Sequence, residues 1–172
     1  MLSPRYVGTR EASERRIPLE RAGFVPRALS AGDVWFPEAG GSTVGLELKK
    51  IGQLLQDLQS GQLNSQLARL QEAVEFPILG IEGHWALDRD GYLTGSRYQW
   101  TAVWKALLSL QDECATRLVL TTSAEGTVQM VLDLAEYYAK ERHASVARHP
   151  SGDPRIATLC RSGTACGGPA SS

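Results

Sequence analysis

Two short motifs in the first third of the chain combine acidic and basic residues at a spacing that suits chemistry on phosphate. Asp33 follows Gly32, and Glu47 and Lys49 stand two residues apart in the segment 43–49. Residues two apart on a strand point to the same face of a sheet, so we expect Glu47 and Lys49 to emerge side by side. A hairpin that brings Asp33 alongside would gather two carboxylates and an ammonium group. Two carboxylates suit Mg²⁺, which keeps several waters and binds substrate phosphate, and the lysine would orient or deprotonate an attacking water.

The pattern of hydrophobic residues predicts the hairpin that this geometry needs. Residues 43–49 alternate between apolar and polar side chains, which is typical of a half-buried strand, and the turn sequence 37–42 separates them from a β-rich run at 34–36. The period then becomes helical and is interrupted at Gly61, which predicts two amphipathic helices or one helix broken there.

The rest of the pattern predicts an α/β fold with a mixed central β-sheet flanked by helices. The amino-terminal runs read as a β-meander, which alternating helices and strands then follow. Ser123 is a candidate N-cap for the last helix. The further elements that we expect are strands at 5–9, 24–29, 77–83 and 117–121, and helices at about 98–112 and 125–141.

Composition is that of an ordinary globular domain. The chain has 172 residues, of which 42% are hydrophobic and 22% charged, and it contains no apolar run long enough to predict a membrane span. A formal net charge of −1 excludes a general polyanion-binding protein of the histone kind, but not a nuclease that contacts DNA through a local patch and a metal. We predict one domain over residues 1–144 and, because 145–172 are poor in large apolar residues, a disordered tail there.

In their order and spacing, several segments resemble the nuclease domain of the XPF/Hef family, which belongs to the PD-(D/E)xK superfamily. The resemblance rests on Val7-Gly8-Thr9-Arg10-Glu11, Gly32-Asp33, Glu47-Leu48-Lys49 and the helical stretch 57–66, and it extends over about residues 5–141. It implies a restriction-endonuclease-like core. It also implies a metal-dependent, structure-selective DNA endonuclease that cleaves forks, flaps or Holliday junctions by phosphodiester hydrolysis.

The resemblance also implies roles for individual residues. Asp33 and Glu47 would hold Mg²⁺ or Mn²⁺, Lys49 would serve the attacking water, and Glu11 would support the site. Three family residues are absent, since Gly8 and Gln53 stand where the family has aspartates and Leu48 where it has arginine. Such losses matter because metal sites tolerate loose positioning poorly. The candidate DNA contacts are Arg10, Lys50, Gln62, Ser65 and Gln66.

The resemblance also implies binding partners for this protein and leaves two alternative functions open. DNA would be branched or duplex, and a homodimer or heterodimer would form through the carboxy-terminal helices, for which Val131, Leu134, Tyr137 and Tyr138 offer apolar surface. We expect no membrane partner, and a cytoplasmic protein in a bacterium or phage or a nuclear one in a eukaryote. Two alternatives remain: a catalytically inactive DNA-binding or dimerisation module of the same fold, and a nuclease subunit of a defence system that relies on a partner for sequence recognition.

Overall fold

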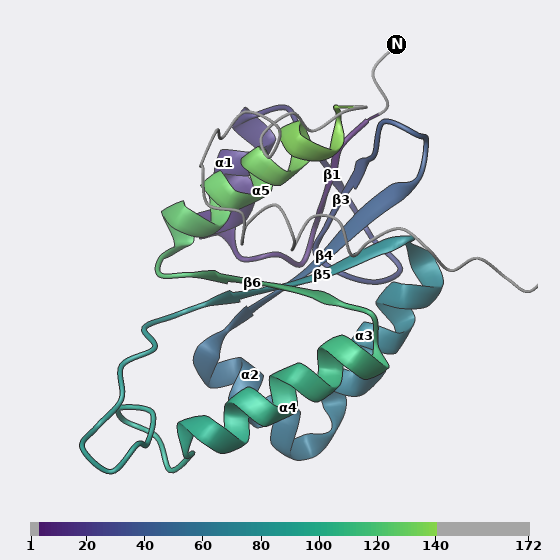
Figure 1. Ribbon diagram of the computed structural model, residues 1–172. Coiled ribbons are helices and arrows are strands. Elements are labelled where there is room, and N and C mark those ends of the chain that lie inside the picture. Colours follow the sequence, from purple (N-terminus) through teal and green to yellow (C-terminus); the bar gives the residue numbers. More distant parts are fainter. Residues whose placement is uncertain (1–3, 141–172) are drawn as a thin grey trace, which may run out of the picture. The chain divides into compact units, whose positions relative to one another are not determined.

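One mixed β-sheet with helices on both faces makes up the described part of the chain, residues 4–140, in the computed structural model (Figure 1). The strands are β1 (Tyr6–Gly8), β2 (Val25–Arg27), β3 (Val34–Pro37), β4 (Thr43–Lys50), β5 (Phe76–Glu82) and β6 (Arg117–Thr121). The helices are α1 (Ser13–Arg21), α2 (Ile51–Ser60), α3 (Gln62–Ala73), α4 (Trp100–Glu113) and α5 (Ala124–Tyr138). The predicted α/β class is confirmed.

The strands lie in the order β2-β1-β3-β4-β5-β6. β3 and β4 form the predicted antiparallel hairpin, while β4, β5 and β6 are parallel and are joined by helices. The predicted β-meander at the amino terminus is wrong. β1 lies between β2 and β3 and pairs with β2 in parallel, because α1 carries the chain across between them. The sequence pattern missed α1, whose only buried apolar residue is Leu19, so it has no apolar stripe to recognise.

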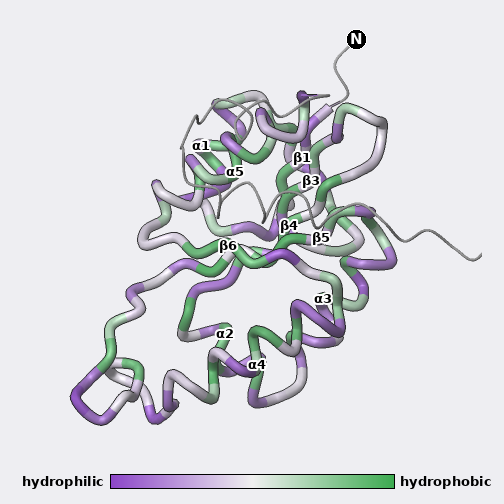
Figure 2. The backbone as a smooth tube through the Cα atoms, in the orientation of Figure 1, coloured by the Kyte–Doolittle hydropathy of each residue, from purple (hydrophilic) through white to green (hydrophobic). Residues whose placement is uncertain are grey.

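The two faces of the sheet carry separate hydrophobic clusters. Figure 1 shows α1 and α5 over one face and α2, α3 and α4 over the other. The alternation along β4 divides its side chains between them: Val44, Leu46 and Leu48 pack with α1 and α5, whereas Glu47 and Lys49 point to the side of α2. Hydrophobic residues gather along β4 and β5, where both faces are covered (Figure 2). A pair of charged side chains is therefore buried on the face that faces α2.

Local signals set the ends of the elements that follow β4. Gly61 adopts a left-handed conformation with φ of 74° and separates α2 from α3, so the prediction of two helices is confirmed. Ser123 caps α5, because its Oγ accepts a hydrogen bond from the amide of Gly126 at 3.1 Å. No helix within residues 4–140 is long and apolar enough to cross a membrane. The predicted tail, 145–172, lies outside the described residues.

Candidate functional site

A polar cavity of about 560 Å³ lies where the β1–α1 connection, the segment before β3, the end of β4 and helices α2 and α3 meet. It gathers most of the site residues that the sequence predicts. Those that line it are Arg10, Glu11, Asp33, Glu47, Lys49, Gln62 and Gln66. Lys50 and Ser65 are exposed and do not line the cavity.

Asp33 links three strands at the floor of this cavity. Its amide donates to the carbonyl of Leu46 and its carbonyl accepts from the amide of Gly8, both at 2.7 Å. Its Oδ2 accepts from the amide of Leu48 at 2.8 Å. The preceding Gly32 has φ of 71°, and a Cβ there would lie 2.8 Å from the carbonyl oxygen of Leu46. Only glycine fits at that point, so the Gly-Asp pair fixes the Asp33 carboxylate against β4.

Glu47 and Lys49 emerge on the same face of β4, as predicted. The Nζ atom of Lys49 lies 3.1 Å from Oε1 of Glu47 and 2.8 Å from Oδ2 of Asp57 on α2, and the lysine is only 3% exposed. Burial acts to lower the pKa of Lys49, but the hydrogen bond to Asp57 and the charge of Glu47 raise it above its usual value. Lys49 therefore carries an ammonium group at neutral pH.

The carboxylates around Asp33 crowd one another. Burial and the nearby charges of Glu47 and Glu11 together raise the pKa of Asp33 to about 7, against the hydrogen bond from Leu48 and the charge of Lys49. Repulsion of this kind between carboxylates is relieved by a bound cation. Within residues 4–140 no three His, Cys, Asp or Glu side chains are placed to hold a metal together. One or two carboxylates with retained waters fit Mg²⁺, which rarely uses a cage made only of protein groups.

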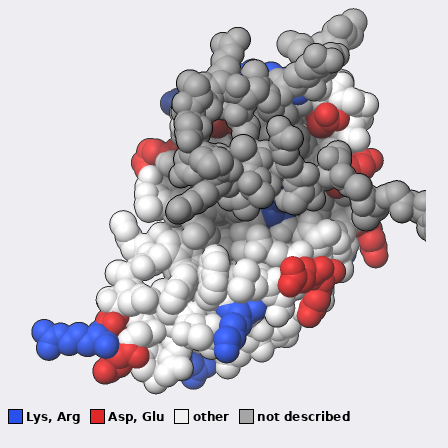
Figure 3. All heavy atoms as spheres, in the orientation of Figure 1, with Lys and Arg blue, Asp and Glu red and all other residues white. Residues whose placement is uncertain are grey.

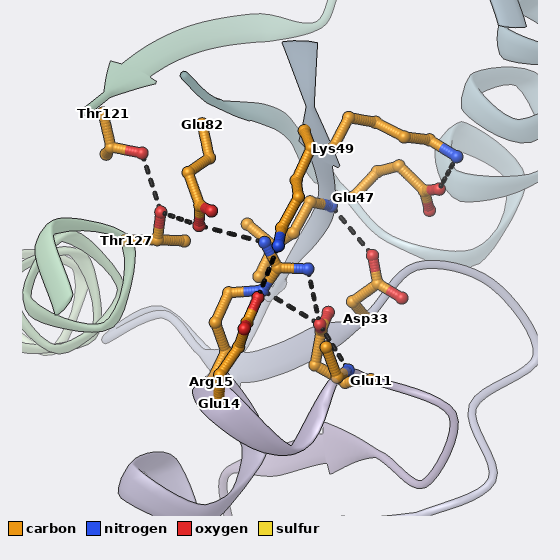
Figure 4. A network of polar contacts seen from close by, with 12 residues as sticks. Glu11, Glu14, Arg15, Asp33, Glu47, Lys49, Glu82, Thr121 and Thr127 are labelled. Atoms are coloured by element: carbon orange, nitrogen blue, oxygen red, sulfur yellow. Dashed lines mark hydrogen bonds and ion pairs between the residues drawn. The ribbon is translucent and has the colours of Figure 1, made fainter. Parts of the chain in front are cut away.

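A second group of buried charges adjoins the cavity, in which one guanidinium, that of Arg15, bridges two carboxylates (Figure 4). Arg15 lies between Glu11 and Glu82: its Nε and Nη2 donate to Oε1 of Glu11 at 2.9 and 2.7 Å, and its Nη1 donates to Oε2 of Glu82 at 3.0 Å. Thr127 on α5 also donates to Oε2 of Glu82, at 2.9 Å, and contacts the hydroxyl of Thr121 at 2.7 Å. The amide of Ala12 completes the donors to Glu11. This network fixes Glu11 at the cavity wall.

Three residues of the site were missed by the sequence reasoning. Arg15 sits on the unpredicted α1, and its bond to Glu82 joins residues 67 apart in the chain. Asp57 stands among the buried leucines of α2, and a charge on the apolar side of a helix is a signal that could have found it. Arg69 lines the cavity three residues after Gln66 and seven after Gln62, so helical spacing could have placed it on the same side of α3.

Lys50 forms an exposed ion pair with Glu14, at 2.7 Å, and does not line the cavity, so its contact with DNA stays a prediction. One expectation needs correction. Val131 and Tyr138 do not offer a free apolar surface, because α5 buries them against the sheet, with exposed fractions of 0% and 6%. Of the proposed interface residues, Leu134 is half-buried and Tyr137 is 44% exposed.

Comparison with known proteins agrees with this architecture. XPF from Aeropyrum pernix, alone and in a complex with DNA, superposes with a TM-score of 0.65 and 24% sequence identity in both cases. The matched regions cover 81% and 84% of this chain, and 63% and 68% of those two chains. At this identity the likeness shows the fold, and no curated protein matches the chain. The model of the ERCC4 domain, however, matches residues 7–134. Since that match covers most of the sequence, the chain belongs to the ERCC4 domain family, a family of structure-specific nucleases.

Proposed function

We propose that this protein is a metal-dependent endonuclease that hydrolyses phosphodiester bonds in branched DNA. The observation that carries the proposal is the crowding of carboxylates in the cavity, where Asp33 and Glu47 share one ammonium group, that of Lys49, while Glu11 is already paired with Arg15. A site of this kind attracts a divalent cation and then the phosphate that the cation binds. Membership of the ERCC4 family supports the same chemistry.

Each side chain has a distinct task in this mechanism. Asp33 and Glu47 would hold the Mg²⁺ or Mn²⁺, which when bound neutralises charge on the phosphate under attack. Lys49 orients the attacking water by donating a hydrogen bond to its oxygen. The raised pKa of Lys49 favours this role over proton abstraction. Glu11, whose Oε1 is held by Arg15 and the amide of Ala12, supports the site as a fixed negative charge.

The DNA backbone would be held by the walls of the cavity. Arg10 and Arg69 are exposed and line the cavity, and within residues 4–140 neither guanidinium has an ion pair or a hydrogen bond that would have to be broken. Gln62 and Gln66 on α3 line the same cavity and can donate to phosphate or sugar oxygens. Lys50 and Ser65 would then contact only DNA that extends beyond the cavity.

A second copy of the chain is the partner that we propose for the face formed by α4 and β6. Leu108 and Leu120 are 40% and 45% exposed there, beside Trp104 at 40%. The surface around α4 is mostly white in Figure 3, although a few Lys, Arg, Asp and Glu side chains interrupt it. An apolar surface of this kind is suited to a dimer interface. Sedimentation equilibrium should detect a dimer, and Leu108→Glu should convert it to a monomer. A chain that is monomeric at tens of micromolar would leave DNA binding to one copy.

Cytoplasm or nucleus is the compartment that this function requires.

A catalytically inactive DNA-binding module is the second candidate, and Gly8 and Gln53 favour it. Restoring both aspartates would be a poor test, because a Cβ at Gly8 would lie 3.2 Å from the carbonyl oxygen of Asp33 and would disturb that residue. Gln53 lines the cavity on α2, and Gln53→Asp adds a carboxylate without that contact. Activity that appears only in Gln53→Asp would favour the inactive module for the natural chain.

The deciding experiment is cleavage of end-labelled forked, nicked and Holliday-junction DNA in the presence of Mg²⁺ or Mn²⁺. We expect cleavage by the wild type and a loss of about 10³-fold or more in Lys49→Ala and Asp33→Asn, since both act on the reacting atoms. DNA binding in EDTA should be retained by Lys49→Ala. Wild-type protein that binds branched DNA but cleaves none of these substrates with either ion would refute the proposal.

A further inference from the structure

Asp57 is the closer of the two carboxylates that hold Lys49. Its Oδ2 lies 2.8 Å from the ammonium, compared with 3.1 Å for Oε1 of Glu47. The side chain of Lys49 is 3% exposed, and those of Asp57 and Glu47 are 11% and 10% exposed. Water therefore contributes little to holding this ammonium, and its position is set by these two partners.

The position of Asp57 excludes a direct role on the substrate. Glu47 and Lys49 line the cavity, whereas Asp57 does not and lies behind them on α2. Its neighbours on that helix, Leu54 and Leu55, are buried in the cluster that covers this face of the sheet. A charge among such residues is destabilising unless an opposite charge meets it. The only ion pair of Asp57 within residues 4–140 is the one with Lys49.

Asp57, the second carboxylate beside Lys49, frees Glu47 from having to neutralise the ammonium and bind a metal at the same time. If Glu47 were the sole partner of Lys49, the same carboxylate would have to neutralise the ammonium and ligate a cation. Asp57 provides a counter-charge that stays with Lys49 whatever Glu47 binds. We propose that Asp57 is a positioning residue, which holds the Lys49 ammonium beside the attacking water and leaves Glu47 available to the metal. This inference rests on the proposed nuclease function.

The first test separates positioning from mere stability. Asp57→Asn preserves size and removes the charge. The matched control is Asp133→Asn on α5, whose aspartate is exposed and, among residues 4–140, bonds only to Gln129. In single-turnover cleavage of a fork well below the melting temperature, we expect Asp57→Asn to slow the reaction about 10- to 100-fold, the usual effect of losing a supporting partner. The dissociation constant for the fork in EDTA should stay within about twofold of the wild type, because the substituted carboxylate touches no DNA. The control should change neither quantity.

A second variant covers the case in which Asp57→Asn does not fold. Asp57→Glu keeps the charge but adds a methylene, which displaces the carboxylate relative to Lys49. Positioning predicts a slower cleavage rate with unchanged DNA binding, whereas a merely structural ion pair predicts the wild-type rate in every molecule that folds. Wild-type cleavage rates in the folded Asp57 variants overturn the proposal.

A double-mutant cycle tests the pairing without any cleavage assay. Asp57→Asn should raise the unfolding equilibrium constant about a hundredfold or more in the wild type, because it leaves the Lys49 charge short of a partner. In a Lys49→Met background the same substitution should have less than about a tenth of that effect. Equal effects in the two backgrounds would show that Asp57 does not hold Lys49. If the cycle shows coupling but the wild type cleaves nothing, the proposed nuclease function is refuted. The pair of Asp57 and Lys49 then has no catalytic role.

Discussion

Two groups of buried charge lie side by side at one end of the sheet, and they differ in how well they are compensated. Arg15 satisfies Glu11 and Glu82 with three N–H groups, and Thr127 adds a further donor to Glu82. Around Asp33, by contrast, burial and the charges of Glu47 and Glu11 together raise the pKa of the carboxyl group to about 7. The first group has the donors that its carboxylates need, whereas the second has room for a cation. The group around Arg15 therefore supports the cavity, whereas the group around Asp33 can bind a cation.

The sharpest test of this contrast is the removal of Arg15. Arg15→Met leaves two buried carboxylates without their cation, so we expect the free energy of unfolding to fall by about 3–5 kcal/mol in urea titrations. Arg16→Met, on the exposed side of the same helix, should cost about 1 kcal/mol or less. Additional neutralisation with Glu11→Gln and Glu82→Gln should restore part of the loss. A small effect of Arg15→Met would abolish the distinction between the two groups.

Asp33→Asn, in contrast to Arg15→Met, should increase the stability of the folded protein. The folded protein raises the pKa of Asp33 from 3.8 to about 7, so it binds this proton more tightly than the unfolded chain does. The corresponding stability is complete below pH about 4 and is lost as the pH rises through 7. In the absence of metal at pH 8, Asp33→Asn should therefore be more stable than the wild type by about 2–4 kcal/mol. The difference should vanish near pH 4, and an advantage that does not change with pH would contradict it.

A smaller loss of stability is expected when Thr127, which bonds to Glu82 in the network around Arg15, is replaced. Thr127→Val keeps the shape of the side chain but removes the hydroxyl that donates to Glu82, so we expect a destabilisation of about 2 kcal/mol. Thr116→Val is the control, since its hydroxyl donates to the neutral backbone carbonyl of Cys114 and should contribute about 1 kcal/mol. Equal losses would indicate that the charge on Glu82 is not stabilised by Thr127.

The smallest effects are expected at the rim of the binding site. Arg69→Ala and Arg10→Ala should each weaken the binding of forked DNA about three- to tenfold and lower the slope of log K against log salt by about 1. Lys50→Ala should have a weaker effect on both quantities, because Lys50 is paired with Glu14 and does not line the cavity. Fluorescence anisotropy at several salt concentrations measures them. A larger loss in Lys50→Ala than in Arg69→Ala would place the DNA path elsewhere.

Much of the fold could be predicted because its signals are local. Alternation predicted β4 within one residue, the glycine at position 61 predicted the break between two helices, and Ser123 predicted the start of α5. The same-face rule predicted the pairing of Glu47 with Lys49. Each of these inferences uses residues that are close together in the chain, where the geometry of a strand or a helix fixes which side chains meet.

What could not be predicted depends on contacts between distant segments. The β1–β2 pair requires α1, and α1 packs through one buried apolar residue, Leu19, and through the bond between Arg15 and Glu82 rather than through an apolar stripe. No periodicity in the sequence encodes a partner 67 residues away. The raised pKa of Asp33 likewise arises from burial and from carboxylates on other elements. Several residues of the site could therefore be named from the sequence, whereas Arg15, Asp57 and Arg69 were missed and the electrostatic state of the site could not be predicted.

The short strands at the amino-terminal edge bear on the order in which the cavity is assembled. All three residues of β2 are exposed, and β1 pairs with it over three residues only. Segments with so few buried contacts open at a lower free energy than the core of a domain. Opening of this edge would withdraw Arg10 and Glu11 from the cavity wall while Glu47 and Lys49 stay in the centre of the sheet. The complete cavity therefore requires the docked edge, which the bond from Arg15 to Glu82 holds together with the buried Val7 and Leu19.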